Sequence, residues 1–194
     1  MRVHVARICV LYEDLEIEWA GAEAEKIAQL DRTGMLTRRF YFVRRALLTL
    51  DEIQQAIHAL QRNKEFKKSK CRWSTENQRM WRDAVKLFSR KQRFLSKWRD
   101  DIGGHFGDKA AEFALDNVRS TTVGLIEIYE RRNGADVKMP FAYELVAAAM
   151  VKNKAEGQGP REFLEEAYGF LLEATRQAIN ACQVIVLEEV LPRF

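Results

Sequence analysis

Cysteine and proline are scarce in this chain of 194 residues, which has three of each. Cys9, Cys71 and Cys182 are odd in number and lie far apart in the sequence, and no Cys-x-x-Cys or Cys/His pair is present. This pattern excludes a disulfide framework and favours free thiols in a reducing compartment. We therefore expect a cytoplasmic protein whose core forms without covalent cross-links.

Long hydrophobic runs are absent as well. The longest are Leu145 to Val151 and Val184 to Leu187, well short of the roughly 20 residues that a bilayer-spanning helix needs. Near the N-terminus, the apolar stretch Ile8 to Tyr12 runs directly into Glu13 and Asp14, which is not typical of a secretory signal. The sequence predicts no association with a membrane.

Motifs of several common enzyme classes are also missing. The chain has no Gly-Lys-Ser/Thr phosphate loop, no Gly-x-Ser-x-Gly elbow and no strand-borne Gly-x-Gly-x-x-Gly. None of its three histidines follows a glutamate in the Glu-x-x-His pattern of di-iron bundles. These absences exclude P-loop nucleotide hydrolysis and serine-hydrolase chemistry, and they indicate no cofactor.

The residues that are present favour one compact helical domain, spanning 1–194. Hydrophobic residues make up 47% and charged residues 31% of the chain, which suits a soluble domain with a real core. Apolar residues recur at steps of three and four, and Gly34 is expected to separate the first two helices. The expected helices cover about 6–30, 36–61, 75–101, 108–117, 141–152 and 160–190, with an exposed basic loop over 62–73.

The stretch between the fourth and fifth of these helices has a different character. Val123 to Tyr129 is rich in β-formers, Asn133-Gly134 is a strong hairpin turn, and Ala135 to Met139 can supply the returning strand. We expect an all-α fold, a bundle of four to six helices with one small inserted β-hairpin. Its parts would be a helical bundle over 1–119, the hairpin over 120–140 and C-terminal helices over 141–194.

Positive charge is concentrated in one block of the chain. Between Arg38 and Arg99 there are 18 Lys and Arg against 5 Asp and Glu, a net of +13, whereas the remainder has 14 against 23, a net of −9. Such a block can attract RNA phosphates through counterion release. It can equally form a solvated face, be compensated by the acidic helices of the chain, or dock onto an acidic protein partner. The candidate RNA-binding residues are Lys64, Lys67, Lys68, Lys70 and Arg72.

Reactive side chains gather between Arg99 and Asp108. Arg99 interrupts an apolar helical stripe, so its guanidinium must either find a partner or open onto a groove. A structural ion pair with Asp100, with Asp101 or with a carboxylate of the acidic helices is one interpretation. A phosphate-binding role in a cleft is the other, and His105 supplies a group that titrates near neutrality.

The spacing of Arg99, Asp100 and His105 resembles the motif of the HEPN superfamily, in which an Arg and an adjoining polar residue precede a His after a short interval. The resemblance implies an all-α, dimeric, metal-independent ribonuclease. Arg99 would bind the scissile phosphate, His105 would transfer protons, and Asp100 would orient one of them.

Helical geometry sets a condition on this chemistry. Residues six apart on a continuous helix point about 120° apart, so Arg99 and His105 converge only through a bend at Gly103-Gly104 or across a twofold axis. The broad apolar stripe of the third helix likewise predicts burial against two helices of the chain or against a second subunit, and we expect a homodimer. Two alternatives stay open, a metal site of Asp101, His105 and Asp108, and a non-catalytic helical protein-interaction module with a basic docking face.

Overall fold

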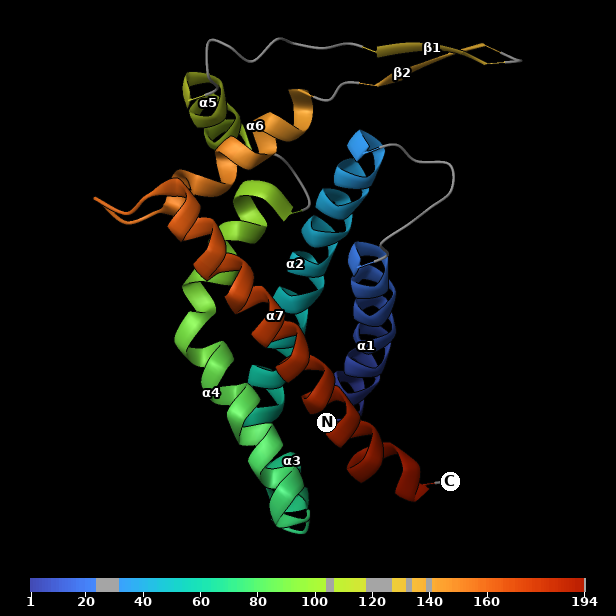
Figure 1. Cartoon of the computed structure of the whole chain (residues 1–194). Coiled ribbons are helices and arrows are strands. Elements are labelled where there is room, and N and C mark those ends of the chain that lie inside the picture. The colour runs from blue at the N-terminus through green and yellow to red at the C-terminus, as the bar shows by residue number, and fades with distance from the viewer. Residues whose placement is uncertain (24–31, 104–106, 118–126, 132–133, 139–140, 194) are drawn as a thin grey trace.

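The computed structural model describes residues 1–23, 32–103, 107–117, 127–131, 134–138 and 141–193. Four long helices form the body of the molecule: α1 (Arg2–Glu23), α2 (Arg32–Arg62), α4 (Thr75–Trp98) and α7 (Pro160–Ile185). In Figure 1, α1 and α2 lie side by side, and α7 crosses the bundle diagonally between α4 and α1. The predicted helical bundle is confirmed.

Helix α2 lies at the centre of the core because apolar residues follow one of its faces. Leu47, Leu50, Ile53, Ile57 and Leu60 are fully buried, as their spacing predicts. The broad stripe of α4 is covered by α2 and α7, so helices of the same chain account for its width.

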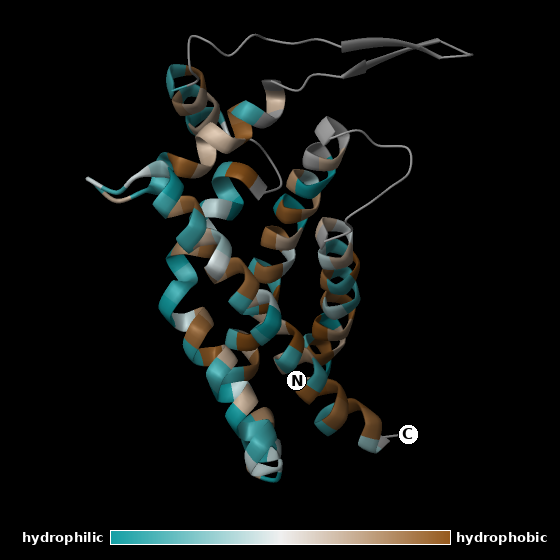
Figure 2. Cartoon of the chain, in the orientation of Figure 1, coloured by the Kyte–Doolittle hydropathy of each residue, from teal (hydrophilic) through white to brown (hydrophobic). Residues whose placement is uncertain are grey.

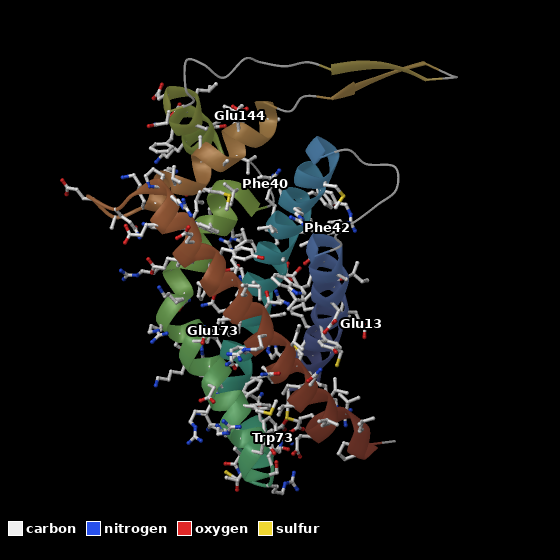
Figure 3. The ribbon with its side chains drawn as sticks, viewed as in Figure 1. Glu13, Phe40, Phe42, Trp73, Glu144 and Glu173 are labelled. Atoms are coloured by element: carbon white, nitrogen blue, oxygen red, sulfur yellow. The ribbon has the colours of Figure 1, made fainter. Side chains whose placement is uncertain are left out.

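Helix α1 approaches α2 closely at a glycine. A Cβ atom at Gly21 would lie 2.6 Å from the ring of Phe42, which is labelled in Figure 3. Glycine is therefore required for this approach, despite its cost of roughly 1 kcal/mol inside a helix.

Shorter helical elements complete the described structure. They are α3 (Lys64–Lys70), α5 (Asp108–Asn117), α6 (Phe141–Met150), π-helical turns at Arg99–Gly103 and Val186–Val190, and 3₁₀ turns at Val151–Asn153 and Leu191–Arg193. The described residues thus contain seven α-helices, more than the four to six expected. No helix among them is long and apolar enough to cross a bilayer.

The additional helix is α3, and it corrects the prediction of an exposed basic loop over 62–73. Asn63 caps α3 by accepting a hydrogen bond from the backbone N–H of Phe66 at 3.0 Å. Phe66 is fully buried, with its ring centroid 5.3 Å from that of Trp73 and 5.0 Å from that of Trp81. A helix of seven residues with one buried side chain shows no apolar period, so the pattern could not reveal it.

The ends of the first two helices also differ from expectation. Helix α1 begins at Arg2, and residues 24–30 of its predicted range lie outside the described residues. Helix α2 begins at Arg32, so Gly34 lies inside it and does not break the chain there. One glycine lowers helix stability only modestly, and burial of the regular apolar face that follows outweighs this cost.

Two short strands lie within the 120–140 segment. Strand β1 (Glu127–Arg131) pairs antiparallel with β2 (Gly134–Lys138), with Glu127 opposite Lys138 and Arg131 opposite Gly134. In Figure 1 the pair lies at the upper end of the molecule, beyond α6. Asn133, half of the predicted turn, lies outside the described residues, as does residue 139 at the end of the predicted returning strand.

Candidate functional site

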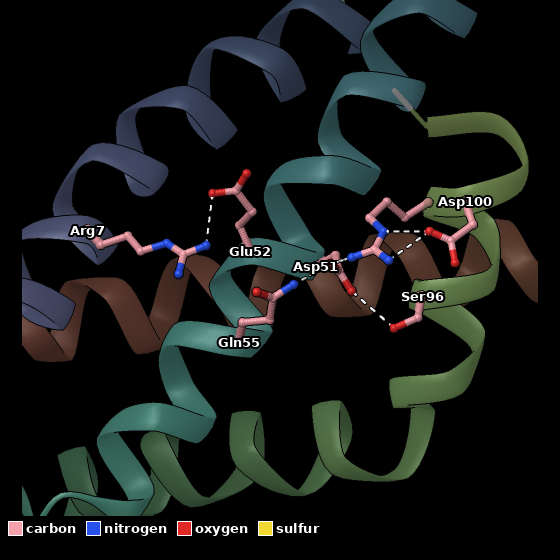
Figure 4. Close-up of polar contacts among 7 residues, drawn as sticks. Arg7, Asp51, Glu52, Gln55, Ser96 and Asp100 are labelled. Carbon is pink, nitrogen blue, oxygen red and sulfur yellow. Dashed lines mark hydrogen bonds and ion pairs between the residues drawn. The ribbon is translucent and has the colours of Figure 1, made fainter. Parts of the chain in front are cut away.

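Arg99 is the centre of a polar network that joins α2 to the end of α4 and includes Asp51 and Asp100, which are labelled in Figure 4. Its Nη1 atom lies 2.7 Å from Oδ2 of Asp51, and its Nη2 and Nε atoms donate to Oδ1 of Asp100 at 2.7 and 2.9 Å. The hydrogen bond to Asp100, together with the charge of Asp51, raises the pKa of the guanidinium above its already high ordinary value. Arg99 therefore holds two carboxylates at once.

Asp51 is the buried member of this network. Its side chain is 3% exposed, against 35% for Arg99 and 65% for Asp100. Gln55 Nε2 donates to Asp51 Oδ2 at 2.7 Å and Ser96 Oγ to Oδ1 at 3.3 Å, so the buried carboxylate accepts hydrogen bonds at both oxygens. An interior charge of this kind persists only when it is paired.

The structure thus brings Arg99 and Asp100 together and gives Arg99 an ion-pair role. His105 lies outside the described residues, so no distance joins it to Arg99. The ion-pair interpretation of Arg99 agrees with these contacts: Asp100 of the reactive run is a partner, as that interpretation allowed, and the buried Asp51 of α2 is a second one.

The π-helical turn after α4 is fixed by two further helical segments. Arg44 of α2 donates through Nε to the carbonyl oxygen of Ile102, while Lys152 and Asn153 donate to Asp101 at 2.7 and 2.6 Å. Asp101, a candidate metal ligand, is therefore committed to two donors. In the part of the chain that the structure describes, no three His, Cys, Asp or Glu residues lie together as a metal site would require.

A second feature is the solvent face of α4, which carries an uninterrupted row of cations. All of its members are exposed, and within the described residues none pairs with a carboxylate. We call this row the α4 basic stripe; its members are Arg79, Arg82, Lys86, Arg90, Arg93 and Lys97.

The spacing of the stripe explains its straightness. Steps of three and four residues place all six side chains within an arc of about 80° and along about 27 Å of helix. The buried residues Trp81, Phe88 and Leu95 occupy the opposite face, so core packing turns the cations outward. Figure 2 shows hydrophilic residues along the length of α4.

Helix α3 extends the positive surface at the N-terminal end of α4. Lys64, Lys67, Lys68 and Arg72 are exposed, and Lys70 is partly buried. The predicted RNA-binding residues therefore lie on a short helix packed beside α4, except for Arg72, which lies in the turn that follows this helix. Trp73, labelled near the lower end of the bundle in Figure 3, is among the residues that hold α3 in place.

Sequence reasoning missed two parts of this arrangement. The buried partner of Arg99 was not identified, although Asp51 lies between the buried positions Leu50 and Ile53 of α2. The α4 basic stripe was also missed, although the three- and four-residue steps of its cations are as regular as those of the apolar residues. Counting charges over a block conceals such a period.

Comparisons of the chain with protein-family models, curated proteins and solved structures gave no match.

Proposed function

We propose that this protein binds RNA through the α4 basic stripe and the adjoining cations of α3. The observation that carries the proposal is the stripe itself, six exposed cations on one helical face. A regular row of positive charges suits RNA, a polymer whose phosphates carry regularly spaced negative charges, because each phosphate that is neutralised releases counterions. Binding of this kind depends on backbone charge and has little sequence preference.

The same surface is less suited to an acidic protein partner. Protein interfaces generally bury aromatic or aliphatic anchors at their centre, and charged residues are depleted there. Among the described residues, the large hydrophobic side chains that are strongly exposed lie on α1, α2, α5, α7 and the C-terminal turns, and none lies on α4. The basic face therefore offers charge without an apolar anchor.

Salt dependence tests the proposal. The triple variant Arg79→Gln, Lys86→Gln, Arg93→Gln should flatten the plot of log affinity against log salt for a single-stranded RNA by roughly two units, at about 0.7 per phosphate contact. Fluorescence anisotropy between about 50 and 200 mM salt measures this slope. The matched control, Lys109→Gln, Lys154→Gln, Arg176→Gln, removes the same charge elsewhere and should leave the slope unchanged.

Two outcomes would overturn the proposal. One is absence of RNA binding by the wild type at low salt, which would favour the non-catalytic interaction module with its basic docking face. The other is an equal loss of slope in both triple variants, which would mean that net charge and not the α4 face drives binding.

RNA cleavage is the second candidate function, and the position of Arg99 favours it. The guanidinium is 35% exposed and is paired with Asp100, in the turn that follows α4. Arg99 faces α2, on the opposite side of the helix from the stripe, so RNA would have to reach it and Asp100 from the end of α4, with His105 as the proton-transfer group that the HEPN resemblance implies. His105→Ala should then reduce cleavage by about 10²- to 10⁴-fold while RNA binding persists. Cleavage that is unchanged in this variant, or that EDTA abolishes, would exclude the assignment.

We also propose a homodimer, formed by the outer face of α1. Val3, Val10 and Ile17 are 77%, 63% and 65% exposed and recur at steps of seven, with the exposed small residues Ala6 and Ala20 along the same helix. This is the spacing of a two-helix seam in which a second α1 packs against the first. Helix α1 lies at the edge of the bundle in Figure 1, where such a partner has access.

A further inference from the structure

A polar pocket lies where α2, α3 and α4 meet. Its volume is about 260 Å³, and it is lined by Gln61 of α2, Lys70 of α3, and Gln78, Arg82 and Val85 of α4. Two cations and two amides thus converge from three helices. Arg82 also belongs to the α4 basic stripe, so the pocket opens from the proposed RNA-binding surface.

The packing beneath the pocket fixes its walls. The rings of Phe66, Trp73 and Trp81 contact one another, with centroids 5.0 to 5.9 Å apart. Trp81 directly precedes Arg82 in the chain, and Phe66 holds the helix that carries Lys70. The aromatic cluster therefore fixes the backbone that carries the two cations, so that binding an anion orders their side chains and not the helices.

Gln78 adds an acceptor of defined orientation. Its Nε2 atom donates to the backbone carbonyl of Trp73 at 2.9 Å. A carbonyl can only accept, so this contact identifies the nitrogen of the amide and leaves Oε1 as the atom available to a ligand. Within the described residues no donor reaches that oxygen.

We propose that this pocket binds one phosphate of RNA together with the ribose 2′-hydroxyl beside it. Lys70 and Arg82 neutralise the phosphate, and Oε1 of Gln78 accepts a hydrogen bond from the hydroxyl. The 2′-hydroxyl is the group that distinguishes RNA from DNA, so the pocket gives the otherwise unselective α4 basic stripe a preference for RNA. This inference rests on the proposed RNA-binding function.

The test uses a small probe, so that it does not depend on binding along the stripe. Adenosine 3′-monophosphate carries the phosphate and the neighbouring hydroxyl, and its 2′-deoxy form lacks only the latter. Titration of the full-length protein, followed by ³¹P NMR, should show about 3- to 10-fold weaker binding of the deoxy form, as expected for one lost hydrogen bond. Equal binding of the two nucleotides would overturn the role of Gln78.

Variants separate the two parts of the pocket. Arg82→Gln and Lys70→Gln should each weaken binding of both nucleotides about 10-fold, as expected for a charge-assisted contact. Gln78→Met should abolish the difference between the two nucleotides while the phosphate is still bound. Lys109→Gln, the matched control on α5, should bind both as the wild type does.

The different ways in which these experiments can fail are distinguishable. If long RNA binds but adenosine 3′-monophosphate does not bind the wild type, the pocket assignment is wrong and the stripe alone carries the function. If the mononucleotides bind as expected but long RNA does not, the pocket stands as a nucleotide site and the proposed function fails. A loss of binding in Lys109→Gln equal to that in Arg82→Gln would show that binding reflects net charge, which overturns the pocket.

Discussion

At the scale of single residues, the buried carboxylate of Asp51 explains why the side chains of Ser96 and Arg99 at the end of α4 turn toward α2. An aspartate in the core requires hydrogen-bond donors. Ser96 of α4, Arg99 of the turn that follows α4, and Gln55 of α2 supply them. Removing only the cation of such a pair costs more stability than replacing both partners with apolar residues, because the carboxylate is left charged and unpaired in the interior.

This asymmetry predicts the effect of replacing Arg99. Arg99→Met should lower the free energy of unfolding by about 3 kcal/mol, somewhat less than for a fully buried pair because Arg99 is partly exposed. Adding Asp51→Leu removes the orphaned charge and should recover much of the loss. Urea unfolding of both single variants and the double variant measures the coupling. Additive losses would show that the two residues do not form an energetic pair.

Glu18 is a second buried carboxylate, and its environment predicts a pH dependence of stability. Burial raises the pKa of Glu18, although Thr49 and Arg45, at 3.4 Å, act in the opposite direction. The folded state then holds the proton more tightly than the unfolded state, so stability falls as pH rises from the ordinary pKa of glutamate through the raised value.

Glu18→Gln should remove this dependence. The variant should gain stability relative to the wild type as the pH rises above the ordinary pKa of glutamate, because the lost ion pair with half-exposed Arg45 contributes little. Urea midpoints measured across this range test the prediction. Glu16→Gln, an exposed change on the same helix that lies off the row of Val3, Val10 and Ile17, is the control and should track the wild type. If Glu18→Gln instead loses stability toward high pH relative to the wild type, the Arg45 pair dominates.

At the scale of secondary-structure elements, α3 shows how little apolar area is needed to order a basic segment. Its lysines repel one another, and a helix of seven residues is not stable alone. Asn63 at its N-terminus and Phe66 in the core fix it against α4.

Helix α3 should therefore depend on Phe66. Phe66→Ala should cost about 3 to 5 kcal/mol, as expected for a buried phenylalanine, and should expose the backbone amides of α3 to hydrogen exchange. Lys67→Ala, at the adjacent exposed position, should change stability by less than about 0.5 kcal/mol. Retention of amide protection across α3 in Phe66→Ala would show that other contacts hold the helix.

At the scale of the whole molecule, charge and apolar surface are segregated onto different elements. The α4 basic stripe and the cations of α3 form one side, whereas the exposed apolar row of Val3, Val10 and Ile17 follows α1. Dimerisation through α1 would therefore leave the basic surfaces of both subunits accessible to RNA.

The dimer prediction is tested by the molar mass in solution. Light scattering at micromolar concentration should give twice 22.6 kDa for the wild type and a monomer for Val10→Lys. Because Val10 is exposed, this change should not unfold the protein. Leu115→Lys is the control, a similar change at an exposed apolar residue of α5. A monomeric wild type across a dilution series would exclude the dimer.

Periodicity by itself determined the long helices, because each buries a continuous apolar face whose three- and four-residue steps are present in the sequence. The predicted helices over 108–117 and from Pro160 onward agree with α5 and α7 for the same reason. The short helix α3 left no such period, since its order depends on aromatic residues of neighbouring segments.

The role of Arg99 was decided only by the tertiary structure. Its position on an apolar stripe showed that the guanidinium needs a partner and offered Asp100, but the sequence could not say that the buried Asp51, 48 positions earlier, is a second one. The junction of Lys70, Gln78 and Arg82 with Gln61 likewise exists only because α2, α3 and α4 meet at one end of the bundle. Local spacing determines which face of a helix is apolar or charged, whereas the packing of the helices determines which of those faces meet.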